Sequence, residues 1–372
     1  VPLLALTADR PPQVRGTGAN QTIDQINLYG TSAKWFQDAP LAAVTDQAHV
    51  RAMAARAWAE ALTPPVGPVH INFPFEEPLI PGEVQPAIET QGPTRTWSAP
   101  SQAAEESALR ALADQAAGRQ GVLIAGPRPD HSTVASIIDL ARATGFPILA
   151  DPLSGLRAGA HDRHHVVAHY DALAQAGFLD ESPPAVAIRF GALPTSKGLN
   201  SWLATHPGVA YAVVDDTGWP DPGGTARTVL RADPATVAGN LAKLITDPAD
   251  DDWLPAWRHA DDIAARTLRM SEASFSELDA IATVFEAVPD PATIWVASSM
   301  PIRQVDLLLG RSSRQLRLLA NRGASGIDGF LSSGIGSAAV GNEPTYVVAG
   351  DLSTLYDLTA LGFAGRHQVD VT

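Results

Sequence analysis

Cysteine is absent from the 372 residues of this sequence. Its absence excludes disulfides, cysteine-ligated zinc, iron–sulfur clusters and thiol nucleophiles. It also fits the reducing environment of the cytoplasm. The sequence has no uninterrupted apolar run near the roughly 18 residues of a membrane span, and no charged-then-apolar signal segment opens it. We therefore expect a cytoplasmic protein without a membrane span.

Basic residues are few. The sequence has 26 lysines and arginines against 40 aspartates and glutamates, which gives a formal net charge of −14 at pH 7. Nucleic acids and anionic membranes select basic surfaces, so neither is an expected partner. An anionic small-molecule substrate would need several of these few arginines gathered at its site.

The order of apolar runs predicts the fold class. Apolar residues make up 45% and charged residues 18% of the chain, as in ordinary globular proteins. Short runs rich in Val, Ile and Leu, typical of strands buried on both faces, alternate with segments of helical period. This alternation predicts an α/β fold with parallel sheets flanked by helices. The expected strands are 3–7, 69–73, 122–125, 147–150, 185–190, 210–214, 294–297, 316–320 and 346–349.

Two segments are expected to separate domains. Residues 78–100 are rich in proline and glycine without periodicity, which predicts a linker. Residues 247–271 begin acidic and turn-rich and then continue as a helix. The expected domains are therefore 1–77, 101–246 and 272–372, the first and last of which look incomplete. Because the chain begins and ends within strand-like segments, we expect it to be a fragment of a longer protein.

A glycine and an aspartate follow the last expected strand. Gly350 and Asp351 stand in the run TYVVAGDLSTLYD, where a helix is expected to start near Ser353. Open α/β sheets bind ligands at the carboxyl ends of their strands, and a helix N-terminus favours anions such as phosphate. An aspartate there can hold a magnesium ion that also takes diphosphate oxygens. A strand end with a helix-capping aspartate is the plainer interpretation.

Glycines are dense in the segment LLANRGASGIDGFLSSGIGSAAVG, residues 318–341. Such density indicates that the backbone approaches a ligand closely or that a helix packs tightly. Gly334-x-Gly336-x-x-Ala339 is a weak match to a dinucleotide-binding pattern, because no strand is expected to lead directly into Gly334. Arg322 is the only cation of the segment and follows a strand end, which favours a binding role.

Ser299 and Arg303 follow another strand end, in the run VASSMPIRQVD. A serine beside an arginine suits carboxylate binding, since the guanidinium offers a bidentate fork. Lys197 also follows a strand end. For these residues, a helix cap and surface cations are the alternative interpretation.

The segment TADRPPQVRGTGANQTIDQ carries Arg10, Asn20 and Gln21. Amide side chains in such a loop can orient a polar ligand. Asn20 could equally cap a helix that starts near Thr22.

Several catalytic patterns are missing from the sequence. The ten histidines show no metal-ligand spacing, and the run HDRHH at 161–165 is expected at the surface. There is no G-x-S-x-G nucleophile elbow and no Walker A loop.

Taken together, the motifs resemble one family. The runs LTADRPP…GANQTIDQ, SSMPIRQVD, NRGASGIDG and GDLSTLYDL occur in the order found in the thiamine-diphosphate-dependent 2-succinyl-5-enolpyruvyl-6-hydroxy-3-cyclohexene-1-carboxylate (SEPHCHC) synthases. The resemblance spans the whole chain. It implies a transferase of menaquinone (vitamin K2) biosynthesis with three α/β domains, which decarboxylates 2-oxoglutarate and adds the succinyl carbanion to isochorismate. It also implies a homodimer or homotetramer with active sites between chains.

The same resemblance implies the site residues. Both substrates are dicarboxylates, so arginines must neutralise them within an acidic protein. The implied substrate-binding residues are Arg10, Asn20, Gln21, Lys197, Ser299, Arg303 and Arg322. The implied cofactor-binding residues are Ile327, Gly350, Asp351, Leu352 and Ser353. Asp351 would hold Mg²⁺ or Mn²⁺ beside the thiamine diphosphate.

Two parts of the family's machinery are not in this sequence. The activating glutamate of the family lies in a part that would precede Val1, and the second metal-binding residue, an asparagine, would follow Thr372. We therefore expect no catalytic residue in this chain and no activity from it alone.

Three other functions stay open at the level of sequence. A carboligase of the acetolactate-synthase type would share fold and cofactor but act on monocarboxylates. A nicotinamide oxidoreductase would need a strand ending at Ser333, and Asp357 has the spacing of its ribose-binding acid. A binding module built on the central domain is the non-enzymatic alternative.

Overall fold

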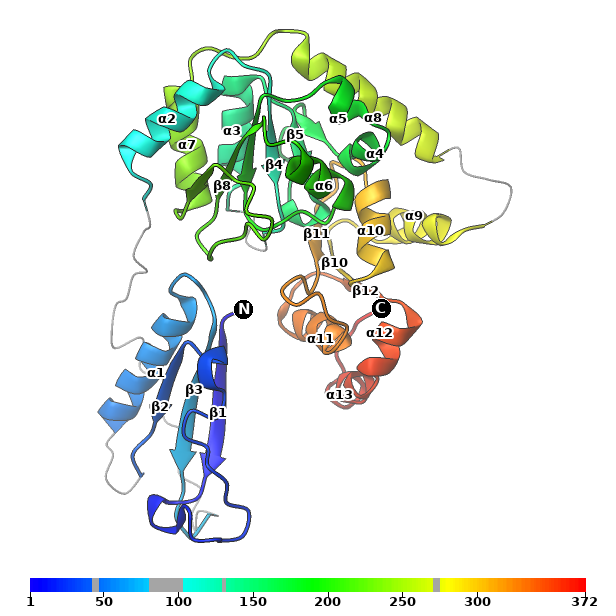
Figure 1. Ribbon diagram of the computed structural model, residues 1–372. Helices are drawn as coiled ribbons and strands as arrows, with labels where there is room; N and C mark the ends of the chain where they lie inside the picture. Colours follow the sequence, from blue (N-terminus) through cyan, green and yellow to red (C-terminus); the bar gives the residue numbers. More distant parts are fainter. Residues whose placement is uncertain (42–46, 80–102, 129–131, 270–274) are drawn as a thin grey trace. The chain divides into compact units, whose positions relative to one another are not determined.

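The computed structural model describes residues 1–41, 47–79, 103–128, 132–269 and 275–372 (Figure 1). The chain forms two compact units, Val1–Ser101 and Gln102–Thr372. Each unit has its own sheets and is described by itself.

The first unit contains a three-stranded parallel sheet in the order β1-β3-β2. One face is apolar: Val69 and Ile71 of β3 pack against Met53 and Ala57 of helix α1. His70 and Asn72 alternate with these residues on β3 and therefore lie on the second face of the sheet, as expected for a period of two. The elements are β1 (Leu3–Asp9), β2 (Trp35–Asp38), α1 (Gln47–Leu62) and β3 (Pro68–Pro74), with short 3₁₀ turns at Pro12–Val14 and Gly30–Ser32.

A six-stranded parallel sheet forms the larger part of the second unit, in the order β6-β5-β4-β7-β8-β9. This is a doubly wound order. Strands β5 and β6 are added on one side of β4, and β7, β8 and β9 are added on the other, so the strand order switches between β4 and β7. Helices cover both faces in Figure 1, with α3 against α7 and α4 against α6. The strands are β4 (Gly121–Ala125), β5 (Ile148–Ala150), β6 (Val166–Val167), β7 (Val186–Phe190), β8 (Ala210–Val214) and β9 (Thr228–Leu230). The helices are α2 (Glu106–Ala116), α3 (Val134–Thr144), α4 (Tyr170–Gln175), α5 (Phe178–Glu181), α6 (Lys197–Thr205), α7 (Pro234–Leu244) and α8 (Trp253–Arg269), with a 3₁₀ turn at Pro152–Ser154.

The rest of the second unit is built on a three-stranded parallel sheet in the order β11-β10-β12. Its central strand is β10, whose Ile294 and Val296 are fully buried. The strands are β10 (Ala292–Val296), β11 (Leu316–Leu319) and β12 (Thr345–Val348). The helices are α9 (Glu277–Ala287), α10 (Met300–Leu308), α11 (Phe330–Val340), α12 (Asp351–Tyr356) and α13 (Thr359–His367).

The expected fold class is confirmed, because every sheet is parallel and flanked by helices. All of the expected strands are present, with ends shifted by one or two residues. The sequence pattern missed β2, which is partly polar, and β6 and β9, which have only two and three residues. No helix among the described residues combines the length and apolar character that a membrane crossing requires.

Some expected boundaries differ from the structure. The helix expected near Thr22 is wrong, because residues 22–29 form turns and irregular backbone. The helix that follows the acidic segment starting at residue 247 begins at Trp253, which is earlier than expected, within the part predicted as turn. The linker over 78–100 lies almost entirely outside the described residues. The expected second and third domains belong to one compact unit.

Gly334 has a packing role. It lies inside α11, so the strand ending at Ser333 that a nicotinamide-binding site requires is absent from this described region, and that alternative is wrong. A Cβ atom on Gly334 would lie 2.5 Å from Cγ2 of Val347 on β12. The glycine therefore lets α11 approach the sheet closely. Gly336, in the same helix, would meet nothing within 4 Å.

These two glycines provide a matched test. We expect Gly336→Ala to stabilise the chain by about 1 kcal/mol, because alanine favours the helix. Gly334→Ala has the same propensity gain but overpacks against Val347, so it should be less stable than Gly336→Ala by about 1–3 kcal/mol. Urea denaturation of both variants measures the difference. Equal stability of the two variants would contradict close packing at Gly334.

Candidate functional site

Three sequence motifs meet at one edge of the third sheet. Ser299 follows β10, Arg322 follows β11, and Asp351 follows β12. The three strands are parallel neighbours with β10 in the middle, so their carboxyl ends lie at the same edge. The chain passes from β10 to β11 on one side and then to β12 on the other, which makes this edge a topological switch point. We call it the carboxyl edge.

Backbone geometry at the end of β10 is unusual. Ser299 has φ 75° and ψ −129°, a region that residues with a Cβ rarely occupy. Its side chain makes no capping hydrogen bond to α10, although it stands at the N-cap. The hydroxyl of the preceding Ser298 donates to the carbonyl oxygen of Asn321 at 3.0 Å, which ties the end of β10 to the end of β11. Ser299 is thus held in place, with its own side chain exposed.

The end of β12 has an exposed carboxylate beside open space. Helix α12 begins at Asp351, two residues earlier than expected, and the backbone N–H of Leu352 donates to Oδ1 of Asp351 at 2.7 Å. A Cβ on Gly350 would meet nothing within 4 Å. Ser353 is buried, and Ile327 is half-buried in the loop before α11.

This arrangement fits a metal ion that shares its ligands with a diphosphate. Among the described residues there is no group of three or more His, Cys, Asp or Glu side chains that could hold a metal alone. Magnesium is commonly held by one or two carboxylates together with phosphate oxygens. Asp351 supplies one such carboxylate, and the space at Gly350 leaves room for the phosphate.

A cavity of about 350 Å³ in the second unit brings together two predicted substrate residues, Lys197 and Arg303. We call it the Lys197–Arg303 pocket. Lys197 is the first residue of α6, and Arg303 lies in the first turns of α10. The other lining residues are Asp171, Gln175, Thr195, Ser196, Leu278, Met300, Gln304, Asp306 and Leu307.

Neighbouring hydrogen bonds fix the walls of this pocket. The Ser196 hydroxyl caps α6 by accepting from the backbone N–H of Leu199 at 3.0 Å, and it donates to Asp171. The side-chain amide of Gln304 donates to Glu277 at 2.7 Å. Lys197 and Arg303 keep exposed side chains between these fixed walls. Two carboxylates, Asp171 and Asp306, also line the cavity, and they accept hydrogen bonds from Ser196 and Arg157. Lys197 and Arg303 are the exposed cations that an anionic ligand would contact.

The predicted residues of the first unit lie in the segment that follows β1. Arg10 is half-buried, with its guanidinium 3.7 Å from the carboxylate of Glu77. Asn20 and Gln21 are exposed, and Gln21 has φ 56°. No helix starts near Thr22, so Asn20 does not have the helix-capping role that the sequence left open.

Sequence reasoning missed a polar network beneath this segment. Arg15 donates to Asp38 and lies 2.9 Å from Asp9, so one cation bridges the last residues of β1 and β2. Asn72 donates to Asp9 at 3.0 Å and to Asp38 at 2.9 Å, and it accepts from Thr7 at 2.8 Å. The network holds the segment with Arg10, Asn20 and Gln21 against the sheet. Its signal in the sequence was Asp9 alone, just after the expected strand 3–7, because the pattern missed the strand that Asp38 ends.

The network shifts the titration of its members. Burial alone would raise the pKa of Asp38, but hydrogen bonds from Arg15 and Asn72 outweigh it and lower that pKa below the usual value. Burial lowers the pKa of His70 on the same face, where its Nε2 lies 2.7 Å from Thr7.

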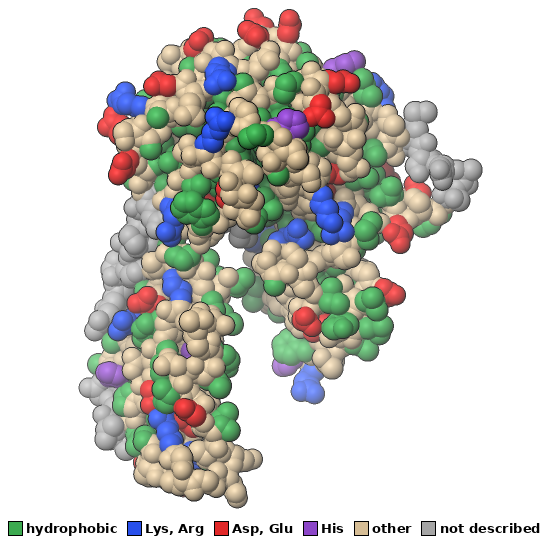
Figure 2. Space-filling model, in the orientation of Figure 1, with side chains coloured by type: hydrophobic (Ala, Val, Ile, Leu, Met, Phe, Trp, Pro, Cys, Tyr) green, Lys and Arg blue, Asp and Glu red, His purple; other side chains and the backbone are tan. Residues whose placement is uncertain are grey.

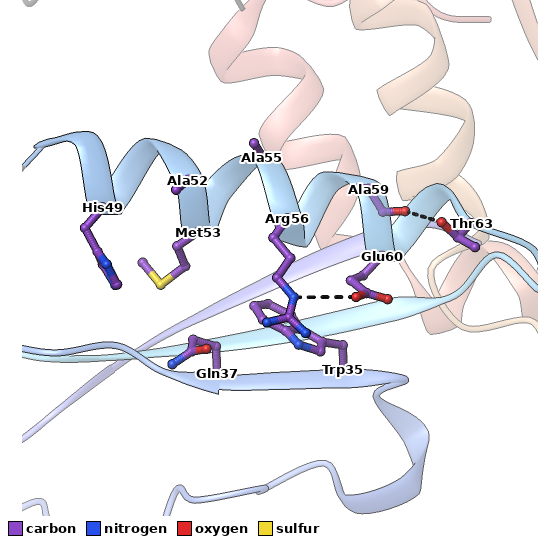
Figure 3. A pocket seen from close by; sticks show the side chains of 10 residues that line it. All are labelled: Trp35, Gln37, His49, Ala52, Met53, Ala55, Arg56, Ala59, Glu60 and Thr63. Atoms are coloured by element: carbon purple, nitrogen blue, oxygen red, sulfur yellow. Dashed lines mark hydrogen bonds and ion pairs between the residues drawn. The ribbon is translucent and has the colours of Figure 1, made fainter. Parts of the chain in front are cut away.

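Another cavity, of about 550 Å³, lies in the first unit between α1 and β2 (Figure 3). Arg56 lies over the ring of Trp35, 5.1 Å from its centroid, and 3.6 Å from Glu60. Its lining includes none of the predicted site residues.

The network predicts a pH-dependent stability. Because the folded pKa of Asp38 is depressed, its stabilisation is fully present above the unfolded pKa and is lost as pH falls through the folded pKa. We expect Asp38→Asn to lower the free energy of unfolding by about 1–2 kcal/mol at pH 7. The deficit should begin to shrink as the pH falls below the ordinary aspartate pKa of 3.8, so it should be smaller at pH 3 than at pH 7.

Urea denaturation at both pH values measures this deficit. Glu60→Gln is the control, because its ion pair is partly exposed and should change stability by less than about 0.5 kcal/mol. A deficit of equal size at both pH values would show that the charge of Asp38 does not stabilise the unit.

Residues 89–296 match a family model described as the middle domain of thiamine pyrophosphate enzymes. The chain is also similar, over its whole length, to the fold of a putative thiamin diphosphate-dependent enzyme from Mycobacterium smegmatis. That likeness has a TM-score of 0.70 at 18% identity and covers 70% of the other chain.

Curated relatives agree with the motif-based resemblance. The chain is 40% identical over its full length to the SEPHCHC synthase of Geobacillus thermodenitrificans and 38% identical to that of Chloroflexus aurantiacus. The SEPHCHC synthase of Halorubrum lacusprofundi is 37% identical. The chain spans about 65% of the length of the first of these relatives. The resemblance inferred from the sequence is confirmed.

Proposed function

The chain belongs to the thiamine pyrophosphate enzyme family, whose middle domain it contains, and we propose that the complete protein is a SEPHCHC synthase. The reaction would decarboxylate 2-oxoglutarate and join the remaining succinyl unit to isochorismate. The observation that carries the proposal is the meeting of three of the family's four motifs at the carboxyl edge. Similarity to the synthases over the whole chain supports it.

The cofactors would lie at the carboxyl edge. When bound, thiamine diphosphate supplies the electron sink for loss of carbon dioxide from a 2-oxo acid. Residues Gly350–Ser353 would hold its diphosphate and Ile327 its apolar part. Asp351 would hold Mg²⁺ or Mn²⁺ against the diphosphate oxygens.

The chain's cations would bind the carboxylates of the substrates. Arg303 and Lys197 line one pocket, and Arg322 follows the neighbouring strand β11. Ser299 would add a hydrogen bond from the end of β10. Guanidinium forks orient a carboxylate as well as neutralise it, so these residues would fix which faces of the two substrates meet.

Arg10, Asn20 and Gln21 would complete the site from the first unit of a partner chain. We propose a homodimer or homotetramer with active sites between chains, in the cytoplasm. Apolar side chains gathered on the surface of α12 and α13 support an association (Figure 2). The exposed large residues there are Leu352, Leu355, Tyr356, Leu358, Leu361 and Phe363. The activating glutamate would lie outside this chain, so we expect the chain alone to be inactive.

The function is tested by incubating the complete protein with 2-oxoglutarate and isochorismate. Consumption of both, with release of carbon dioxide, is the expected result. Turnover of monocarboxylic 2-oxo acids without use of isochorismate would instead indicate the acetolactate-synthase type. The requirement for several site arginines favours the dicarboxylate reaction.

Replacing Arg303 tests the carboxylate site. We expect Arg303→Met in the complete protein to raise the KM for one of the two dicarboxylates at least about tenfold, because it removes a charge-assisted hydrogen bond of about 1.5–3 kcal/mol. Arg317→Met is the control, since Arg317 is an exposed arginine on β11. Unchanged KM values for both substrates would exclude Arg303 from the site.

Replacing Asp351 tests the metal site. We expect Asp351→Asn to weaken the metal-dependent binding of thiamine diphosphate at least about tenfold, because a neutral amide is a poorer magnesium ligand than a carboxylate. Calorimetric titration with and without a chelator measures the binding, with Asp370→Asn as the control. Equal, chelator-sensitive binding by Asp351→Asn would place the metal elsewhere.

A further inference from the structure

We propose that Arg157 is a positioning residue: it fixes helix α10 and thereby holds Arg303 at the pocket that Arg303 shares with Lys197. The inference rests on the proposed function for the identity of the substrates. It extends that function by naming a residue that would set affinity without touching the ligand.

Arg157 links the central sheet to the end of α10. Its Nε donates to the carbonyl oxygen of Ala150, the last residue of β5, at 2.6 Å. Its Nη1 donates to the carbonyl oxygens of Asp306 and Leu309 at 2.7 and 2.9 Å. Its Nη2 donates to the Asp306 carboxylate. All three nitrogens of one side chain are therefore used.

These contacts cap the C-terminal end of α10, and they also pair Arg157 with the Asp306 carboxylate. The carbonyl groups in the last turn of α10 lack partners within the helix, and a cation at that end is favoured by the helix dipole. Arg157 supplies both the donors and the charge. Its own backbone is also fixed, because its carbonyl oxygen accepts from the N–H of Ser312 at 2.8 Å.

The pair is fully buried. The side chains of Arg157 and Asp306 are 1% and 3% exposed, and the guanidinium lies 5.6 Å from the ring centroid of Tyr170. Burial raises the pKa of Asp306 to about 7, against the opposing effect of Arg157. A buried ion pair contributes little net stability, because desolvation offsets the attraction. What it adds here is a defined orientation of α10 relative to the central sheet.

That orientation matters because the pocket has two halves. Lys197 comes from α6 of the central part, and Arg303 from α10 on the third sheet. Arg303 lies one turn before Asp306 on the same rigid helix, and both line the pocket. A displacement of the end of α10 therefore changes the spacing of the two cations that a dicarboxylate would contact.

Removal of Arg157 leaves Asp306 buried without its partner and is therefore destabilising, so KM values are compared only for variants whose circular dichroism spectrum is native. A second link joins the same regions. Asp261 of α8 accepts from the backbone N–H and the Nδ1 of His169 at 2.8 and 3.0 Å, and it lies 3.6 Å from Arg311 after α10. The variants named below therefore report on position.

The experiment is a double-mutant cycle in the complete protein. Arg157→Met should raise the KM of the substrate whose KM also rises in Arg303→Met, by about tenfold, with kcat changed less than about threefold. The double variant should have the KM of Arg303→Met alone, because Arg157 acts through Arg303. Arg157→Lys should recover part of the affinity. Additive effects of the two substitutions would overturn the proposal.

Arg142→Met is the matched control, since this arginine of α3 makes exposed ion pairs with Asp139 and Asp162 and should leave both KM values unchanged. If the wild-type protein does not turn over the two substrates, the proposed function fails by itself. The same cycle is then measured as the dissociation constant of 2-oxoglutarate. Coupling between Arg157 and Arg303 in that constant supports positioning, and additivity or the absence of binding overturns it.

Discussion

Parallel pairing of β10 with β11 and with β12 places three strand ends at one edge. Every group assigned to the carboxyl edge depends on this register. Ser299, Arg322 and Asp351 stand far apart in the sequence, yet each is the third residue after a strand of the same sheet. A shift of one residue in a strand would reverse the faces of its side chains. It would also displace the residues that follow the strand, so the meeting of these groups requires the observed register.

Charge distribution is the second constraint. The chain carries 26 basic and 40 acidic residues, so an anionic substrate approaches a molecule that repels it on average. Many described arginines are already paired with carboxylates or carbonyl oxygens, as Arg15 and Arg157 show. Lys197 and Arg303 differ from these because their side chains are exposed at a cavity. The pocket therefore offers two exposed cations within an acidic protein, beside the carboxylates of Asp171 and Asp306.

The sequence predicted the strands and their motifs because buried parallel strands have a strong local signal of branched apolar residues. It also predicted that residues at strand ends would form a site. It could not predict that Lys197 and Arg303 share a cavity, since that depends on how the central sheet packs against α10. Similarly, Arg15 and Asn72 were missed because their roles arise from the meeting of three strands.

One consequence concerns evolution of the first unit. Asp9, Arg15, Asp38 and Asn72 satisfy one another through shared hydrogen bonds. If Arg15 were lost, two neighbouring carboxylates would be left without their common cation, so a lineage that changes Arg15 should also change Asp9 or Asp38. The four positions are thus expected to covary among relatives.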